Sequence, residues 1–388
     1  MVPLRRERMA AAQPLDLAIV GGGLAGGLLA LALAARRPEL RVGLIEAGDR
    51  FGGNHLWSFF DGDVDADGRA LVAPLVAHRW PGYDVRFPGL SRTIDTGYHS
   101  IPSERLDAAL RAALPAERLF TGTGATIEPG GVGLADGRRL PAGAVIDARG
   151  PGDLSLLRGG WQKFVGLHLT LDAPHGLTRP VVMDATVEQI DGYRFVYLLP
   201  FGPAEIFVED TYYSDTPDLD VPAIRARIAA YATARGWRVA GEERIETGVL
   251  PVISGGDFAA YWGAGGAKAG MRAGLCQPTT GYTLPDAVRL ALRITAAPDL
   301  GQAALDRLTR EHAAAAWGAR GFYRLLDRML FGAAAPAERW RVLQRFYRLP
   351  APLISRFYAG RSTLADQARV LMGRPPVPIG RALKVMWR

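Results

Sequence analysis

The chain has 388 residues, of which 48% are hydrophobic and 22% charged, with 46 Lys/Arg against 39 Asp/Glu. This is an ordinary globular composition, and the length allows a sizeable buried core divided among two or three lobes. The single cysteine, Cys276, excludes an intrachain disulfide, so nothing calls for an oxidising compartment and we expect a cytoplasmic protein.

Residues 17–35 carry no charge, which raises the possibility of a signal peptide or a membrane span. Five glycines within this stretch and a change of hydrophobic period argue against both. The pattern instead predicts a buried strand at 15–20, a glycine turn at 21–27 and a helix at 28–35. A second strand, "RVGLIEAG", completes the β-α-β order of a nucleotide-binding sheet.

Gly21, Gly23 and Gly26 fit the pattern G-x-G-x-x-G between the first strand and the helix. Such glycines permit a tight turn, close approach of a pyrophosphate to the backbone, and close helix–strand packing. Glu46 follows the second strand, where an acid accepts hydrogen bonds from a ribose hydroxyl and repels a 2′-phosphate. No second fingerprint follows, so we expect one tightly held nucleotide, for which FAD is a better candidate than exchangeable NAD. The alternative is a tight turn selected for packing alone.

The amino-acid composition changes in the middle of the chain. After a loop containing "FGGNHLWSF", an amphipathic helix is predicted at 103–113, followed by short β segments. Residues 160–245 are rich in β-formers, and two of their runs, joined by Pro200-Phe201-Gly202-Pro203, predict a hairpin. A helix is predicted at 223–237, and the sequence is mainly helical from about residue 285 onward.

Two adjacent acids, Glu209 and Asp210, end the apolar run of "AEIFVEDTYY". Side chains alternate between the faces of a strand, so only Glu209 shares a face with Glu205 and Phe207 unless a bulge turns both acids inward. The simplest interpretation of such a pair is the surface end of a strand.

A second glycine cluster, "AGMRAGLCQPTTGYTLPDAV", places Pro278, Thr280 and Gly281 shortly before a predicted helix. The positive end of that helix can face an anion, such as the N1–C2=O edge of a reduced flavin. An ordinary turn from loop to helix is the alternative.

The last part of the chain is basic, with 14 Lys/Arg against 4 Asp/Glu in residues 311–388, and aromatic residues are interleaved with the charges. This composition suits an anionic membrane surface, although a helical lobe with buried aromatics and solvated arginines is the simpler interpretation of the composition alone. No nucleic-acid-binding motif accompanies the charge, so we expect no nucleic-acid partner.

These motifs occur together with "GGNHLWSF", "MDATVEQIDGYRFVYLLP", "VEDTYY" and "FYRLLDRMLFGAAAPAERWRVLQRFYRLP" in one order. Over nearly its whole length the chain resembles the bacterial lycopene β-cyclases, an FAD-containing family of carotenoid biosynthesis. The resemblance implies an α/β fold similar to aromatic hydroxylases and geranylgeranyl reductases. It implies a Rossmann-like FAD-binding domain at 14–155 and 246–300, an inserted β-sheet substrate domain at 156–245, and a helical, basic and aromatic membrane-facing region at 301–388.

The resemblance also implies an activity, a non-redox isomerisation in which the ψ-ends of lycopene close to β-rings, giving γ-carotene and then β-carotene. It implies that FAD must be reduced, with NADPH as the external reductant. It further implies peripheral association with the cytoplasmic membrane and possible contact with other enzymes of carotenoid biosynthesis.

Site residues follow from the resemblance motif by motif. Glu209 and Asp210 match the acidic pair of the family, and we expect Glu209 to donate the proton and Asp210 to tune or anchor it. The expected cofactor-binding residues are Gly21, Gly23, Gly26 and Glu46 for the ADP part, Arg105 for the pyrophosphate, and Pro278, Thr280 and Gly281 near the isoalloxazine. No metal site is predicted.

The chain departs from the expected pattern in two places. Cys276 and Gln277 stand where an aromatic residue and a histidine are expected, so no imidazole is available there. Gly270 is followed by Met271, so the acid that related hydroxylases present to the ribityl chain is missing.

A hydrocarbon substrate offers only an alkene to protonate, and that step requires a carboxylic acid rather than a carboxylate. Desolvation and nearby negative charge, from Asp210 or a reduced flavin, both favour the protonated form of Glu209. Two alternatives remain: a flavin-dependent monooxygenase or reductase acting on a hydrophobic isoprenoid, and a carotenoid- or lipid-binding protein with a vestigial flavin fold.

Overall fold

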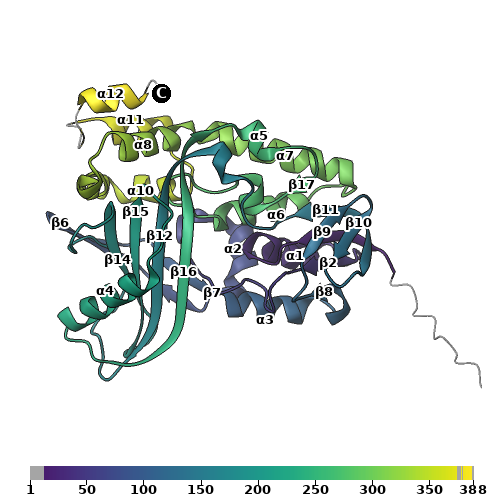
Figure 1. The fold of residues 1–388 in the computed structure, drawn as a ribbon, viewed down its shortest axis with the longest axis horizontal. Helices are drawn as coiled ribbons and strands as arrows, with labels where there is room; N and C mark the ends of the chain where they lie inside the picture. Colours follow the sequence, from purple (N-terminus) through teal and green to yellow (C-terminus); the bar gives the residue numbers. More distant parts are fainter. Residues whose placement is uncertain (1–12, 374–376, 378, 387–388) are drawn as a thin grey trace, which may run out of the picture.

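The computed structural model describes residues 13–373, 377 and 379–386, so parts of the predicted C-terminal region (374–376, 378 and 387–388) lie outside the described residues. Two seven-stranded sheets form the two halves of the molecule, and helices of the C-terminal region lie above the second sheet (Figure 1). A small three-stranded sheet completes the architecture. In the described ranges, no helix is long and apolar enough to cross a bilayer.

The strands are β1 (Leu15–Val20), β2 (Val42–Ile45), β3 (Leu56–Phe60), β4 (His78–Trp80), β5 (Tyr83–Phe87), β6 (Leu90–Ile94), β7 (Tyr98–Pro102), β8 (Leu119–Phe120), β9 (Ala125–Glu128), β10 (Gly131–Leu134), β11 (Arg139–Asp147), β12 (Leu157–Leu171), β13 (Val181–Asp184), β14 (Tyr193–Pro200), β15 (Glu205–Ser214), β16 (Val239–Gly256) and β17 (Ala267–Lys268). The helices are α1 (Leu24–Arg36), α2 (Ala66–Val72), α3 (Ser103–Ala113), α4 (Val221–Ala234), α5 (Phe258–Trp262), α6 (Leu284–Thr295), α7 (Gln302–Ala319), α8 (Gly321–Gly332), α9 (Trp340–Phe346), α10 (Ala351–Tyr358), α11 (Leu364–Leu371) and α12 (Ile379–Met386).

The first sheet has the order β8-β2-β1-β11-β10-β9, and β17 pairs with β11. Its central strands are parallel, and β1 is apolar because helices and neighbouring strands bury almost all of it. Helix α1 packs against α3 and α6, and its glycines permit the close approach: Leu106 of α3 lies where a Cβ of Gly27 would be. The first half therefore has the β-α-β core that the sequence predicts.

The second sheet has the order β16-β12-β15-β14-β13-β5-β6 and is antiparallel except for the β13–β5 pair. Helix α4 packs against β12 and β15 on one face, over a core of aliphatic side chains. The other face is aromatic and packs against α8, α9 and α10. The two faces of this sheet therefore have different chemical surroundings.

Several predicted elements are confirmed. Helix α3 covers residues 103–113 as predicted, and β14 and β15 form the hairpin expected around Pro200–Pro203. Helix α1 begins at Leu24, four residues earlier than predicted, because the glycine turn is shorter than the run of glycines suggests. The predicted helix at 223–237 begins and ends earlier, at Val221 and Ala234.

The sheets divide the chain differently from the predicted domain boundaries. Strands β5 and β6, which the prediction assigned to the FAD-binding domain, belong to the second sheet. Strand β16 runs from Val239 to Gly256 and crosses the predicted boundary at residues 245 and 246 without a break, because it pairs with β12 over the whole length of that strand.

Strand β15 separates its two adjacent acids. Its pairing with β14 is regular from residue 206 to 213, so no bulge brings both acids to one face. Asp210 is fully buried on the face covered by α4, where Arg194 donates hydrogen bonds of 2.8 and 2.9 Å to its two oxygens. The Tyr212 hydroxyl donates a third, 2.9 Å in length. Burial raises the pKa of Asp210, and the hydrogen bonds and charge of Arg194 oppose that rise.

We predict that Asp210→Ala lowers the free energy of unfolding by about 3–5 kcal/mol, because it leaves the buried Arg194 guanidinium without its partner. Denaturant unfolding measures this change. The matched control is Glu242→Ala, which breaks the more exposed Arg225–Glu242 pair of the same domain and is expected to cost about 1 kcal/mol or less. Equal losses in the two variants would contradict a structural role for Asp210.

Candidate active site

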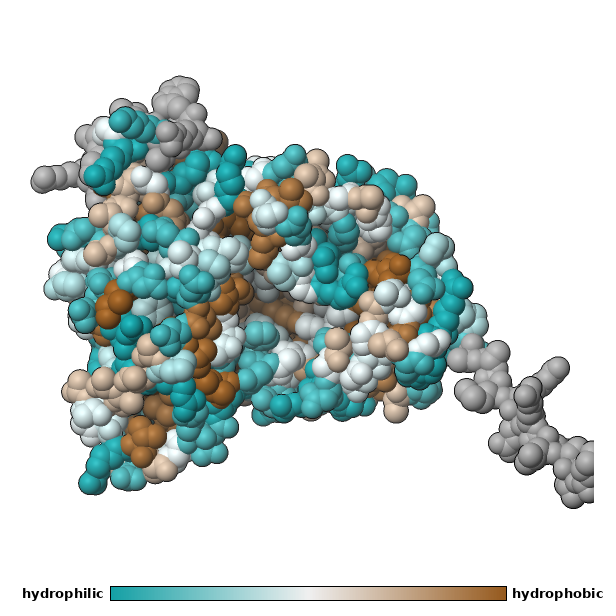
Figure 2. Space-filling model, viewed as in Figure 1, coloured by the Kyte–Doolittle hydropathy of each residue, from teal (hydrophilic) through white to brown (hydrophobic). Residues whose placement is uncertain are grey.

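A cavity of about 320 Å³ lies between the aromatic face of the second sheet and the glycine loop of the first half. In Figure 2 a hollow with an apolar floor opens between the two halves of the molecule. Because Glu209 and Glu246 both line this space, we call it the acid cavity. Residues from β12, β14, β15, β16, the start of α1 and the start of α6 form its wall. The glycine loop, the second glycine cluster and the strand that carries Glu209 therefore meet at one site.

Glu209 is the one residue between 206 and 214 that is not fully buried, and it lines the acid cavity. The Thr211 hydroxyl donates a 2.7 Å hydrogen bond to Glu209 Oε1. Burial raises the pKa of Glu209 to about 8; the Glu246 carboxylate and, more weakly, Asp210 add to the rise, while Thr211 opposes it. At neutral pH, Glu209 is therefore mainly a carboxylic acid that faces a cavity.

Glu246, on β16, is the second acid of the cavity, and sequence reasoning missed it. It is 3% exposed and accepts hydrogen bonds of 3.2 and 3.1 Å from the backbone N–H of Leu56. His55 Nδ1 lies 3.1 Å from Glu246 Oε1. No local signal marks this residue, because a single glutamate in the β-rich run "RIETG" is unremarkable until the strand pairings are known.

The two glutamates lie on one face of the sheet on either side of β12. Glu209 and Glu246 are both paired with Gly166, so their Cα atoms are two strand spacings, or about 10 Å, apart. The Phe207 ring occupies the space where a Gly166 Cβ would be. An aromatic ring therefore covers the backbone between the two acids, which is consistent with the separate roles of a protonated Glu209 and a hydrogen-bonded Glu246.

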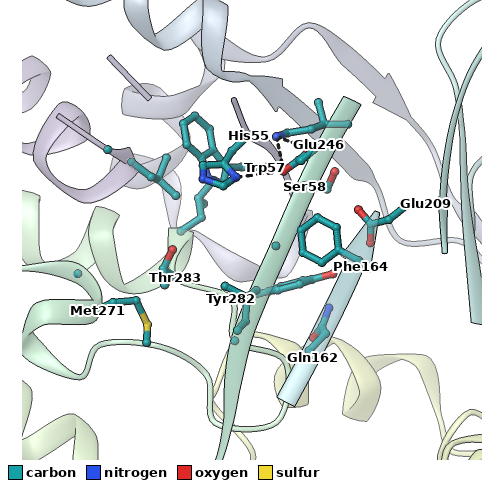
Figure 3. A pocket seen from close by; sticks show the side chains of 18 of the residues that line it. His55, Trp57, Ser58, Gln162, Phe164, Glu209, Glu246, Met271, Tyr282 and Thr283 are labelled. Atoms are coloured by element: carbon teal, nitrogen blue, oxygen red, sulfur yellow. Dashed lines mark hydrogen bonds and ion pairs between the residues drawn. The ribbon is translucent and has the colours of Figure 1, made fainter. Parts of the chain in front are cut away.

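A second aromatic ring also covers a glycine of the sheet. The Phe164 ring, two residues before Gly166 on β12, lies over Gly248 of β16. Figure 3 shows the Glu246 carboxyl beside His55, and the Glu209 carboxyl across the cavity near Phe164. The Tyr197 and Tyr282 hydroxyls are 2.9 Å apart. The aromatic side chains that line the cavity are Trp57, Tyr98, Phe164, Tyr197, Phe207 and Tyr282.

Asp210 does not line the acid cavity. It lies on the opposite face of β15, with Arg194 and Tyr212, and its effect on Glu209 is the smaller electrostatic one described above. Its expected role as a tuner stays a prediction, and the structure places a stronger source of negative charge, Glu246, on the cavity side.

The glycine loop fits the phosphates of a dinucleotide. Gly21 has φ +109°, and a Cβ at Gly26 would collide with the Gly21 carbonyl oxygen, so neither position accepts a side chain without strain. Space around Gly23 is open at the start of α1, where unpaired N–H groups attract anions. Glu46 Oε2 accepts a 2.8 Å hydrogen bond from Gly22 N–H, so the acid expected to contact the ribose is fixed beside the loop.

The second glycine cluster forms a loop that ends at α6. Gln277 Oε1 accepts hydrogen bonds of 2.6 Å from Thr279 N–H and 2.9 Å from Thr280 N–H, so the residue that replaces the expected histidine holds the loop in shape. Gly281, with φ +70°, lines the acid cavity, whereas Thr280 does not. The Pro278 carbonyl accepts a 3.0 Å hydrogen bond from Ile253 N–H, which ties the loop to β16.

Met271 also lines the acid cavity, at the position where related hydroxylases place an acid. Arg105 lies elsewhere. It is exposed in the first turn of α3 and lines a separate cavity with His78 and Phe201. Its assignment to a pyrophosphate stays a prediction that no contact of the described residues supports.

Solved structures show the same fold at low sequence identity. A geranylgeranyl bacteriochlorophyll reductase-like protein from Thermoplasma acidophilum has a TM-score of 0.57 and 14% identity over 96% of this chain and 98% of its own. A p-nitrophenol 4-monooxygenase from Pseudomonas putida has a TM-score of 0.59 and 15% identity over 93% of this chain and 99% of its own. These likenesses confirm the predicted fold class, the α/β fold of aromatic hydroxylases and geranylgeranyl reductases.

Sequence comparison identifies much nearer relatives. A lycopene beta-cyclase of Pseudescherichia vulneris is 50% identical over 96% of each chain. A lycopene beta-cyclase of Pantoea ananas is 44% identical over 96% of this chain and 97% of its own. Residues 16–384 match the family model described as lycopene cyclase protein. The chain therefore belongs to the lycopene cyclase family.

Proposed function

We propose that the protein is a lycopene β-cyclase, an FAD-dependent enzyme that closes the ψ-ends of lycopene to β-rings, forming γ-carotene and then β-carotene without net redox change. The observation that carries this proposal is Glu209, a carboxylic acid with a pKa raised to about 8 that faces an aromatic cavity in a chain of this family. Because the substrate has no heteroatom, protonation of a terminal alkene is the step that starts ring closure. Glu209 is the residue placed to donate that proton.

Glu246 supports this role in two ways. Its negative charge is the larger electrostatic contribution to the raised pKa of Glu209, so it helps keep the acid protonated. The Leu56 N–H and His55 hold its carboxylate at the opposite side of the cavity, where a carboxylate can accept the proton that leaves the ring. We propose that Glu209 is the acid and Glu246 the base.

The aromatic wall suits a cationic intermediate. The faces of Phe164, Tyr197 and Phe207 offer cation–π stabilisation, which is larger in a desolvated site than in water. The apolar side chains of the wall offer water few hydrogen-bond partners, which disfavours capture of the cation as an alcohol.

We propose that Gly21, Gly23, Gly26 and Glu46 hold the ADP part of FAD, with Arg105 near the pyrophosphate and Pro278, Thr280 and Gly281 near the isoalloxazine. When bound and reduced, FAD supplies negative charge and an electron-rich ring next to the cation. NADPH is the proposed external reductant. The start of α6, at Leu284 and beside Gly281, contributes a positive helix end that favours the reduced, anionic form of the ring.

We also propose that the protein associates peripherally with the cytoplasmic face of the membrane through its basic C-terminal region, because its substrates reside in the bilayer. Contact with other enzymes of carotenoid biosynthesis fits the same location. The charge of residues 311–388 supports this proposal, since cationic side chains are attracted to anionic lipids.

The first prediction concerns the proton donor. Glu209→Gln removes the proton but keeps the size of the side chain, so we expect it to abolish β-ring formation while FAD is retained. Product analysis and flavin absorbance measure the two outcomes. The matched control is Glu205→Gln, an exposed position on the same face of β15, which is expected to turn over normally. Normal turnover in Glu209→Gln would remove Glu209 from the mechanism.

The second prediction concerns pH. Glu209 is protonated below its pKa of about 8, so kcat is expected to fall as pH rises through that value. Glu246→Gln removes a negative neighbour and therefore lowers the pKa of Glu209. Because this variant also lacks the proposed base, the titration of the Glu209 carboxyl is followed by infrared spectroscopy rather than by turnover, and its midpoint is expected to move to lower pH. The control is Glu243→Gln, an exposed position on the same strand. An unchanged midpoint in Glu246→Gln would show that Glu246 does not tune the acid.

The third prediction separates the proposed function from a monooxygenase of the same fold. Chemically reduced enzyme incubated with lycopene without oxygen is expected to form γ-carotene and β-carotene, because ring closure consumes no oxidant. Chromatographic identification of the products measures this. A strict requirement for oxygen, or an oxygenated product, would contradict the proposal.

A further inference from the structure

A second cavity, of about 330 Å³, lies beneath the C-terminal helices. Aliphatic and aromatic side chains of α8, α9, α10 and α11 form most of its wall, among them Leu326, Val342, Phe357 and Val370. We call it the C-terminal cavity. The functional roles assigned above do not explain an apolar space at this place. Of the proposed cofactor-binding residues, Thr280 lines it, because its loop borders the cavity.

The wall of the C-terminal cavity is almost without charge. Asp327 belongs to it and is fully buried, and burial raises the pKa of its carboxyl well above the ordinary value, which favours the uncharged form. A basic residue, Arg345, also lines this cavity, and it donates a hydrogen bond to the Met372 carbonyl. A space with such a wall accepts an apolar ligand and penalises a charged or strongly polar one.

The C-terminal cavity lies beyond the acid cavity along β15. Tyr213 lines it, and this residue lies four positions beyond Glu209 on the same face of the strand, which is a distance of about 13 Å. Thr279 and Thr280 line the C-terminal cavity, whereas the next residues of the same loop, Gly281 and Tyr282, line the acid cavity.

One pair of aromatic rings stands at the boundary between the two spaces. The rings of Tyr282, in the acid cavity, and Tyr358, in the C-terminal cavity, have centroids 6.3 Å apart. The two cavities therefore share a wall made of a loop and tyrosine side chains rather than of paired strands. Opening this boundary requires one of these rings to move, against the hydrogen bonds that join Tyr282 to Tyr197 and Tyr358 to Tyr347.

We infer that the C-terminal cavity holds the distant part of the linear polyene while one of its ends reacts at Glu209. This inference rests on the proposed function, which gives a long hydrocarbon substrate with two equivalent ends. Only one end fits beside Glu209 at a time, and the remainder requires an apolar space in line with it. The C-terminal helices also carry the basic charge proposed to face the membrane, so a chain leaving the bilayer reaches this cavity before the acid.

The experiment fills the cavity and compares two substrates. Val370→Trp, on α11, adds volume to the cavity wall, and Leu364→Trp, on the same helix at a position 82% exposed, is the matched control. Lycopene is compared with an apo-lycopenal, a shortened polyene that keeps one ψ-end. Losing apolar contacts equivalent to a few methylene groups lowers kcat/KM roughly tenfold or more. We therefore expect Val370→Trp to lower kcat/KM for lycopene by that factor and to leave kcat/KM for the shortened substrate unchanged.

Binding provides a readout independent of turnover. Equilibrium gel filtration of the as-purified protein, followed by polyene absorbance, is expected to show weaker retention of lycopene by Val370→Trp than by Leu364→Trp. If Val370→Trp does not fold, Val342→Phe, on α9, makes the same test with a smaller change. Equal kinetic effects on both substrates, or no effect on either, would overturn the inference. Failure of the unmodified protein to cyclise either substrate would instead overturn the proposed function.

Discussion

Successive side chains of β15 point to opposite faces of the second sheet, and this alternation gives two adjacent acids different surroundings. Asp210 meets a guanidinium, a tyrosine hydroxyl and a helix, which hold its buried carboxyl group. Glu209 meets aromatic rings, a threonine hydroxyl and a distant carboxylate, and burial and that carboxylate raise its pKa. A bulge of one residue between the two acids would exchange or merge these roles, so the regular register of the β14–β15 hairpin is the condition for the proposed chemistry.

The glycines of the neighbouring strands are the second part of this arrangement. Gly166 and Gly248 leave space above the sheet, and the rings of Phe207 and Phe164 occupy it. Large rings can therefore lie flat over the backbone beside Glu209. A side chain at either glycine would push a ring into the cavity. The same substitution thus affects sheet packing and the electrostatic surroundings of the acid, which couples stability to function.

Much of the site could be predicted from sequence because the evidence is local. The glycine fingerprint, the hairpin and the two faces of β15 each follow from spacing within a short segment, and the period of two correctly separates Glu209 from Asp210. Glu246 could not be found in this way. Its place opposite Glu209 depends on the pairing of β16 and β15 with the same residue of β12, and such a register is set by contacts distant in sequence.

The sheets divide the chain differently from the predicted domain boundaries for a related reason. Strands β5 and β6 join the second sheet through a parallel pair with β13, a contact between segments about a hundred residues apart that leaves no local pattern. At Gln277, by contrast, the departure from the expected pattern is visible in the sequence itself. An expected histidine is absent, and the side chain in its place accepts backbone hydrogen bonds that keep the loop in position.

The central claim is that Glu209 carries a proton at neutral pH. Infrared difference spectroscopy tests it directly, because a protonated carboxyl has a C=O stretch that a carboxylate lacks. Asp63 and Asp327 are also buried acids with raised pKa values, so the spectrum of Glu209→Gln must be subtracted from that of the unmodified protein. We expect a band that depends on Glu209 and disappears with a midpoint near pH 8. Absence of such a band at neutral pH would contradict that claim.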